Sequence, residues 1–330
     1  MFLVLELLCC YRERHAHSRA GKSTGGAGQF GAAQVLRRAT GGDYSSNCII
    51  GQDKTLAEYC DAIAAAGVLT TEPGTFSYGL GALVLGRVCE VVSARLTHTE
   101  EKFSDIMTRL LFRPLKMHSA AFYLPNGDPR APKIPTLFGG VPRADSSGCD
   151  VKPYHKCLPP SPTSLPANTV STDNAAGPRK CESGDTGTCM TVRDYSRFYE
   201  FLLRGGTTED GVRLLSQQAV HRMTNDRFGG LDRSSVPAHV CKVTGTGDEN
   251  ALLDRPSFFD FGMAVSPKTA KYPHECWWGG YAQNFGRLYP DDDSYLLVFP
   301  QFMFTSPGGM MYGNKIIKQP ALEKFLSLWK

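Results

Sequence analysis

The amino-acid sequence predicts an α+β fold, in which an antiparallel sheet is flanked by helices. Three observations support this expectation. Apolar residues recur at helical spacing in several segments between residues 54 and 225. Strand-like segments then cluster between about residue 256 and residue 302, and segment 320–330 is again typical of a helix. Helices followed by strands and a closing helix are the order expected of an α+β domain.

The first helix is expected at 55–67, with the sequence TLAEYCDAIAAAG. Thr55 is a suitable N-cap, and Glu58, three positions later, completes a capping box. Gly67 is a typical stop signal, because glycine adopts the left-handed conformation that often ends a helix.

Four more segments have apolar residues at helical spacing and are predicted as helices: 80–96, 101–117, 191–204 and 214–226. The helix at 101–117 is expected to end near Pro114, since proline interrupts a helix. Thr191 is the expected N-cap of the helix at 191–204, and Gly205 and Gly206 are expected to end it. The apolar face of this third helix consists of Tyr195, Phe198, Phe201 and Leu202. Ser216 is the expected cap of the fourth.

Strand-like patterns occupy three segments near the C-terminus: 258–265, 277–290 and 294–302. The acidic run from Asp291 to Asp293 lies between the last two, where a hairpin turn is needed. An antiparallel meander is therefore expected over this part of the chain.

Two segments differ in composition from the rest. Residues 1–50 include GKSTGGAGQFGAA, in which five glycines fall within eleven residues, too many for a stable helix or strand. Residues 125–180 are rich in Pro, Ser, Gly and Asn with little periodicity, and are expected to form an excursion, a lid or a disordered segment. We therefore divide the chain into a Gly-rich segment, 1–50, and one domain, 51–330.

The composition favours a soluble globular protein, with 42% apolar and 21% charged residues. The net charge of +4 is small, and no Lys/Arg run indicates a nucleic-acid groove. The apolar start MFLVLELLCC lacks a positive leader and is too short to span a bilayer. Neither nucleic acid nor a membrane is therefore expected as a partner, and no feature indicates an oligomeric state.

The eleven cysteines include no C-x-x-C pair, so zinc-type spacing is absent and at least one thiol is left over from any disulfide set. Reduced, mostly buried thiols are the better interpretation, which favours the cytoplasm. His274, Glu275 and Cys276 resemble metal ligands, but no second cluster accompanies them, and we predict a structural role. No metal or organic cofactor is expected.

Two short patterns near the N-terminus suggest other functions. Residues 16–23, AHSRAGKS, are close to a phosphate-binding P-loop with Lys22 as its lysine, and 21–25, GKSTG, fits the G-x-S-x-G of a nucleophile elbow around Ser23. Each motif needs a strand before it and a helix after it. The flanking residues favour neither, so a flexible Gly/Ser segment is the default prediction.

Several later segments together resemble the serine β-lactamase-related hydrolases, which include class C β-lactamases, DD-peptidases and family VIII esterases. These segments are 55–94, 110–125, 186–206, 210–226 and 277–301. The first contains FSYGLG around Tyr78, and the last contains WWGGYA, whose Trp278-Gly279-Gly280 is similar to the W-G-G of esterase-type members. The resemblance implies a β-lactamase/DD-peptidase-like fold with a helical subdomain.

The resemblance also implies a chemistry. In this family a Ser attacks an ester or amide carbonyl, and a Lys one helical turn later shares its proton. Tyr78 matches the tyrosine that acts as general base and acid. Trp278, Gly279 and Gly280 match the strand on which the substrate lies, and the backbone N–H of Tyr281 would be an oxyanion donor. A strand bulge without a substrate is the alternative for the glycines.

The match departs from the family at three places near these motifs. The turn before Tyr78 is one residue shorter than is typical. Leu80 stands where the family often has Asn, which removes a polar contact to the substrate. Lys116 replaces the Gly of the usual P-L-G-M.

The expected nucleophile is missing, because no Ser-x-x-Lys precedes Tyr78. The one match in the chain, Ser327 to Lys330, lies in the expected closing helix after every other matched segment. We therefore expect an N-terminally incomplete family member that is inactive as written, with a small ester or amide as its substrate if it is active. The alternative is a non-catalytic remnant that binds a ligand or a partner.

Overall fold

The computed structural model describes the chain in segments: residues 54–66, 81–125, 127–136, 138–142, 149–153, 176–177, 182, 184, 188–225, 258–260, 263–268, 270, 273–279, 284–304, 324 and 327. These residues belong to two compact units. The first unit comprises Met1–Tyr123 and Pro178–His221, and the second comprises Leu124–Gly177 and Arg222–Lys330. Segment 1–50 and the two N-terminal motifs lie outside the described residues, as does most of the expected closing helix.

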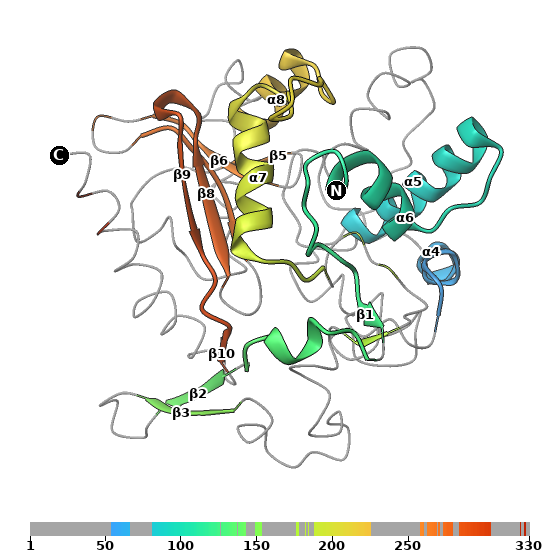
Figure 1. Cartoon of the computed structure of the whole chain (residues 1–330), viewed down its shortest axis with the longest axis horizontal. Coiled ribbons are helices and arrows are strands. Elements are labelled where there is room, and N and C mark those ends of the chain that lie inside the picture. The colour runs from blue at the N-terminus through green and yellow to red at the C-terminus, as the bar shows by residue number, and fades with distance from the viewer. Residues whose placement is uncertain are drawn as a thin grey trace, which may run out of the picture. The chain divides into compact units, whose positions relative to one another are not determined.

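The first unit is helical (Figure 1). Its helices are α4 (Leu56–Ala66), α5 (Gly81–Thr97), α6 (Phe103–Met107) and α7 (Val192–Leu203). Helices α4 and α6 both pack against α5. The predicted helices at 55–67, 80–96 and 191–204 are confirmed to within a few residues.

The predicted N-caps are also confirmed. Thr55 Oγ1 accepts a hydrogen bond from the Glu58 N–H at 3.2 Å, and the Thr55 N–H donates to the Glu58 carboxylate at 2.6 Å, which is the reciprocal capping box. At α7, the Asp194 N–H donates to Thr191 Oγ1 at 3.2 Å. Ser216 Oγ accepts from the Ala219 N–H at 3.1 Å at the start of α8 (Gln217–Thr224), the helix predicted at 214–226.

The helix predicted at 101–117 is wrong in one respect, because the α-helix ends at Met107 and a π-helical turn follows at Thr108–Phe112. The wider turn has a packing reason. Ile106 and Leu111 are both buried, as are Met107 and Phe112, so buried residues recur at a spacing of five. A π-helix bonds residue i to i+5 and keeps such pairs on one face, whereas an α-helix rotates them apart.

The backbone at Gly184 closely approaches the backbone of α5. Gly184 lies against this helix so closely that a Cβ built on it would be 2.1 Å from the carbonyl oxygen of Ala82 and 3.3 Å from the amide nitrogen of Gly86. No real Cβ tolerates the first of these distances. The position therefore requires glycine, although nothing in the local sequence pattern predicts the contact.

Two carboxylates from separate segments meet the start of α6. Glu90 accepts from the Phe103 N–H at 3.2 Å, and Glu182 accepts from the Ser104 N–H at 2.7 Å. These are first-turn amides that have no partner within the helix. Burial raises the pKa of Glu90 above its ordinary value of 4.5, and the neighbouring Glu182 adds to the rise, while Arg87 opposes it.

This raised pKa predicts a pH-dependent stability. Because folded Glu90 takes up its proton at a higher pH than in the unfolded chain, the free energy of unfolding falls as pH rises from 4.5 through the folded-state pKa. Above that window the buried charge is a constant cost. We expect Glu90→Gln, which retains an oxygen for the Phe103 N–H, to be more stable than the wild type at pH 7. Urea melts at pH 7 and pH 4.5 check this, and an advantage that fails to shrink at the lower pH contradicts it.

The main sheet belongs to the second unit and has five antiparallel strands in the order β5-β6-β7-β8-β9 (Figure 1). Their bounds are β5 (Phe258–Asp260), β6 (Met263–Ser266), β7 (Glu275–Gly279), β8 (Phe285–Tyr289) and β9 (Ser294–Val298). The antiparallel meander is confirmed, and so is the hairpin at the acidic run. There a 3-10 turn at Pro290–Asp292 joins β8 to β9, and Asp293 adopts a left-handed φ of 45°.

The strand bounds correct the predictions. The segment 258–265 forms two paired strands rather than one, with Phe258 opposite Val265. The segment 294–302 is also divided, because β10 (Phe302–Phe304) leaves the main sheet and pairs in parallel with β2 (Phe138–Pro142). Apolar alternation is the same on either side of such breaks, so the pattern alone does not locate them.

Parts of the Pro/Ser-rich segment 125–180 form short strands that the sequence pattern did not predict. Strand β2 pairs antiparallel with β3 (Cys149–Pro153), and β1 (Leu124–Pro125) pairs in parallel with β4 (Ala176–Gly177). Across the ranges that the structure describes, no helix is long and apolar enough to cross a membrane.

Candidate functional site

The predicted W-G-G motif begins in β7, near the centre of the main sheet. Successive side chains of a strand point to opposite faces, so Glu275 and Trp277 share one face while Cys276 lies on the other. At the end of the strand the Trp278 ring stacks on the Trp277 ring, with 6.1 Å between their centroids. The strand is buried up to Trp277 and becomes partly exposed at Trp278 and Gly279. Its C-terminal end is therefore the part that a small molecule can reach.

The first face of β7 contains a buried polar network. Arg287, from β8, forms an ion pair with Glu275, and both side chains are only 1% exposed. The Arg287 guanidinium lies 5.2 Å from the centre of the Trp277 ring, where a cation is attracted to the ring face. The Trp277 indole N–H donates to Ser266 Oγ, on β6, at 3.1 Å. These contacts hold the strand in place immediately before Trp278.

The second face of β7 is tied to the end of α8. The carbonyl oxygen of Thr224 lies 2.7 Å from His274 Nε2 and accepts a hydrogen bond from the Cys276 thiol at 3.1 Å. The other ring nitrogen of His274 lies 3.1 Å from the Asp291 carboxylate. Each ring nitrogen of His274 therefore contacts a protein group that joins β7 to a neighbouring segment. These contacts support the structural role predicted for 274–276.

Burial makes the thiols near these helices and strands poor nucleophiles. It raises the pKa of Cys276 above its ordinary value, and raises that of Cys89 to about 12. A thiolate is the reactive form of cysteine, so neither side chain is suited to attack a substrate. Among the described residues, no group of three or more His, Cys, Asp or Glu side chains is arranged to hold a metal ion.

The described pairs of β7 extend further on its β8 side than on its β6 side, where residues 261–262 lie outside the described part of the chain. On the β8 side the register continues from Cys276–Leu288 to Gly279–Phe285. On the β6 side the described pairs end at Ala264–Trp277. Trp278 and Gly279 thus extend along β8 beyond the described pairs with β6.

The other predicted site residues have different positions. Tyr78, Gly280 and Tyr281 lie outside the described residues, so the structure does not bring them to β7 or separate them from it. Ser327 is described and exposed, and its hydroxyl donates to the carbonyl oxygen of Lys324 at 2.7 Å, while Lys330 lies outside.

Sequence reasoning missed Arg287 and Ser266, which support β7 from its two neighbouring strands. One signal was available for Arg287, because an arginine within an otherwise apolar strand segment needs a buried partner. Ser266 gave no such signal, since a serine at a strand end is common.

Comparison with known families settles the ancestry of the chain. A family model described as beta-lactamase matches residues 24–311, which is most of the sequence. The chain belongs to the beta-lactamase family. The matched range begins inside segment 1–50, which the resemblance had left out, and it includes the Pro/Ser-rich segment 125–180. No curated protein sequence matches this family member significantly.

Solved structures share the fold at low sequence identity. EstCE1, a hydrolase with promiscuous acyltransferase activity, is 19% identical with a TM-score of 0.55, over 87% of this chain and 70% of its own. The LovD6 mutant of simvastatin synthase from Aspergillus terreus is 14% identical with a TM-score of 0.53, over 84% of this chain and 66% of its own. The unliganded selenomethionyl form of LovD is 13% identical with a TM-score of 0.51, over 86% of this chain and 69% of its own. The β-lactamase/DD-peptidase-like α+β fold is thereby confirmed.

Proposed function

We propose that this family member binds small esters or amides along the C-terminal end of β7 and that its 330 residues alone do not form an acyl-enzyme. One observation carries the binding proposal. Trp278 and Gly279 are partly exposed at the end of a strand that is otherwise buried, so this stretch is the part of β7 that a substrate can reach. Gly279 favours close approach, because it has no side chain.

The residues would act together as the family resemblance implies. The indole of Trp278 is partly exposed and provides an apolar wall suited to an acyl or alkoxy group. The backbone N–H of Tyr281, after Gly280, would stabilise negative charge on the carbonyl oxygen. Tyr78 would transfer the proton between a nucleophile and the leaving group only if a serine–lysine pair were supplied, since none precedes it within these residues. The acyltransferase and hydrolase activities named for EstCE1 suggest ester substrates for this chain as well.

The proposed inactivity rests on the nucleophile. A serine is a weak nucleophile unless a neighbouring base takes its proton, and no Ser-x-x-Lys stands before Tyr78 within these residues. The late pair, Ser327 and Lys330, is a poor substitute, because the Ser327 hydroxyl is exposed and donates to a backbone carbonyl. A ligand-binding protein without turnover is the function that follows.

Two assays on the full 330-residue chain test the proposal. We expect a fluorophosphonate probe to label no serine and p-nitrophenyl butyrate to hydrolyse at the uncatalysed rate. Labelling of any serine refutes the inactivity, and its loss in Ser327→Ala would assign the C-terminal pair as the source.

Binding is measured separately, by saturation-transfer NMR with ethyl butyrate. We expect signal transfer to the ester in the wild type and a severalfold weaker signal in Trp278→Ala, because the apolar wall is lost. Trp329→Ala is the matched control, since it removes the same side chain outside β7. Equal transfer in all three proteins contradicts the assignment of β7.

A further inference from the structure

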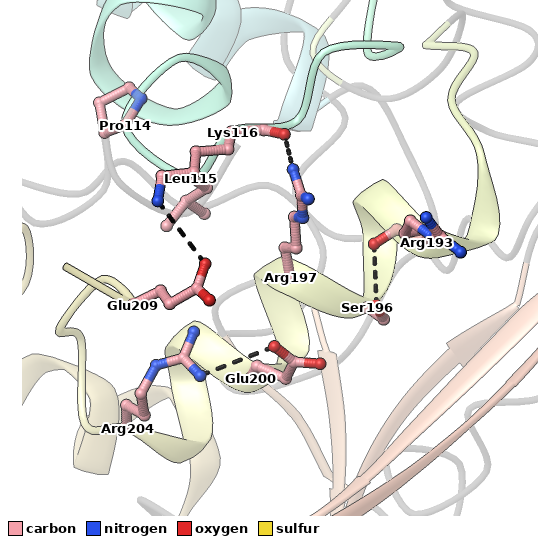
Figure 2. Close-up of a pocket in the computed structure, with 9 residues that line it drawn as sticks. All are labelled: Pro114, Leu115, Lys116, Arg193, Ser196, Arg197, Glu200, Arg204 and Glu209. Carbon is pink, nitrogen blue, oxygen red and sulfur yellow. Dashed lines mark hydrogen bonds and ion pairs between the residues drawn. The ribbon is translucent and has the colours of Figure 1, made fainter.

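Helix α7 carries a stripe of charged residues that the proposed function does not use. Arg193, Arg197, Glu200 and Arg204 are spaced by four, three and four positions, which places them on one side of the helix and its C-cap. Residues on other positions of α7, including Phe198 and Phe201, are buried. Figure 2 shows the stripe beside the segment that contains Lys116.

A cavity of about 170 Å³ lies along this stripe, within the first unit. Its lining residues are Pro114, Leu115, Lys116, Arg193, Ser196, Arg197, Glu200, Arg204 and Glu209. The volume is well above what one ordered water needs, so a small molecule fits. Four of the lining side chains are cationic and two are anionic. Asp210 and Asp194, outside the lining, pair with Lys116 and Arg197, so the cavity is distinguished by its directed N–H donors and not by a net charge.

Several guanidinium donors in this cavity have no partner in the part of the chain that the structure describes. Arg197 donates one N–H, from Nη1, to the carbonyl oxygen of Lys116, and Nη1 also lies 3.8 Å from the Asp194 carboxylate. Its Nε and Nη2 groups have no partner among the described residues. The Arg193 guanidinium makes no hydrogen bond or ion pair to a described residue. Arg204 donates Nε to Thr207 and lies 3.6 Å from Glu200 through Nη1, which leaves Nη2.

Lys116 occupies its place at the cavity in a strained backbone conformation. Its φ is +56°, in the left-handed region that normally favours glycine, and the family often has Gly at this position. A lysine held in such a conformation is a reason to look for a function. Its Nζ donates to Asp210 at 2.7 Å and lies 3.7 Å from Glu209, so the ammonium is held at the cavity rim.

We propose that this cavity binds a phosphate group, either as the free ion or as a small phosphomonoester. Arginine forks match the oxygen geometry of phosphate, and a lysine adds a compact charge beside them. A phosphate offers three or four acceptor oxygens in different directions, which suits donors that approach from successive turns of one helix and from the facing segment. A carboxylate has only two oxygens in one plane and satisfies fewer of these donors.

The charges around the cavity predict opposite effects for two neutral substitutions. Arg197→Gln removes a charge-assisted hydrogen bond and is expected to weaken phosphate binding at least tenfold (~1.5 kcal/mol or more). Glu209→Gln removes a negative charge from the lining and is expected to tighten binding severalfold. Glu209 is exposed and Arg197 is partly exposed, so the fold is expected to tolerate both changes, which thermal melts verify.

Isothermal titration calorimetry of the full chain with sodium phosphate, at low ionic strength and with sodium chloride as the ionic-strength control, tests the proposal. Saturable binding of one phosphate, with the two expected changes, supports it. Arg109→Gln is the matched control, because Arg109 pairs with Glu101 in the same unit outside the cavity, and its binding should equal that of the wild type. Tighter binding of glycerol 3-phosphate assigns a phosphomonoester, and tighter binding of inorganic phosphate assigns the free ion.

Two results would overturn the assignment. One is the absence of saturable binding of either compound to the wild type. The other is binding that Arg197→Gln leaves unchanged, which would place the phosphate elsewhere on the chain.

Discussion

Gly184→Ala is expected to lower the free energy of unfolding by about 3 kcal/mol, because the new methyl group has no room. Its Cβ would lie 2.1 Å from the Ala82 carbonyl oxygen, which is helix backbone and not the flexible end of a side chain. The segment at 184 must then move away from α5 and expose part of the helix. Urea-induced unfolding, followed by circular dichroism, measures the loss.

Gly211→Ala is the matched control for this prediction. Gly211 has a φ of +82°, but nothing lies within 4 Å of a Cβ at its position. Its replacement is expected to cost only the backbone strain, about 1 kcal/mol. If the two variants lose the same stability, steric exclusion at Gly184 is not the cause, and the described approach of the two backbones is wrong.

Glu275→Gln is expected to destabilise the protein by about 3 to 5 kcal/mol, because it leaves Arg287 buried without its counter-charge. The guanidinium is 1% exposed, so water cannot replace the lost carboxylate. Arg287 also lies over Trp277, the residue before Trp278, so the end of β7 should lose its fixed position. Thermal unfolding measures the stability, and the chemical shift of the Trp278 indole N–H reports the position of the strand.

A double substitution separates the buried charge from the lost contact. Glu275→Leu combined with Arg287→Met replaces the ion pair with apolar groups of similar length and is expected to recover most of the stability. Recovery identifies the unpaired buried charge as the main cost. A double variant as unstable as Glu275→Gln would show instead that the specific polar network, including Trp277 and Ser266, is what the sheet requires.

Local features of the fold were predictable because each depends on residues a few positions apart. The capping box of Thr55 and Glu58, the cap at Thr191 and the stop at Gly205–Gly206 are all visible in short stretches of sequence. The π-helical turn at Thr108–Phe112 was missed, although its five-residue spacing of buried residues is present in the sequence. An α-helical template does not test that spacing.

The candidate site was predictable only as far as its motif. Trp278 and Gly279 were found from the resemblance to a family, and the match over residues 24–311 confirms that family. Arg287 and Ser266 were not found, because their contacts join strands that are separate in the sequence. The roles of all five predicted residues stay predictions: Tyr78, Trp278, Gly279, Gly280 and Tyr281.

The sequence by itself determined the fold class, most helices and their caps, and the family, and it shows no Ser-x-x-Lys before Tyr78 within these 330 residues. Only the tertiary structure decided where the strands divide, that β8 pairs with β7 up to Gly279, and that Lys116 joins the arginines of α7 around one cavity. The physical reason is the range of the interactions. Helix caps and periodicity arise from neighbours in the chain, whereas strand register, buried ion pairs and cavities arise from segments that meet only when the whole core packs.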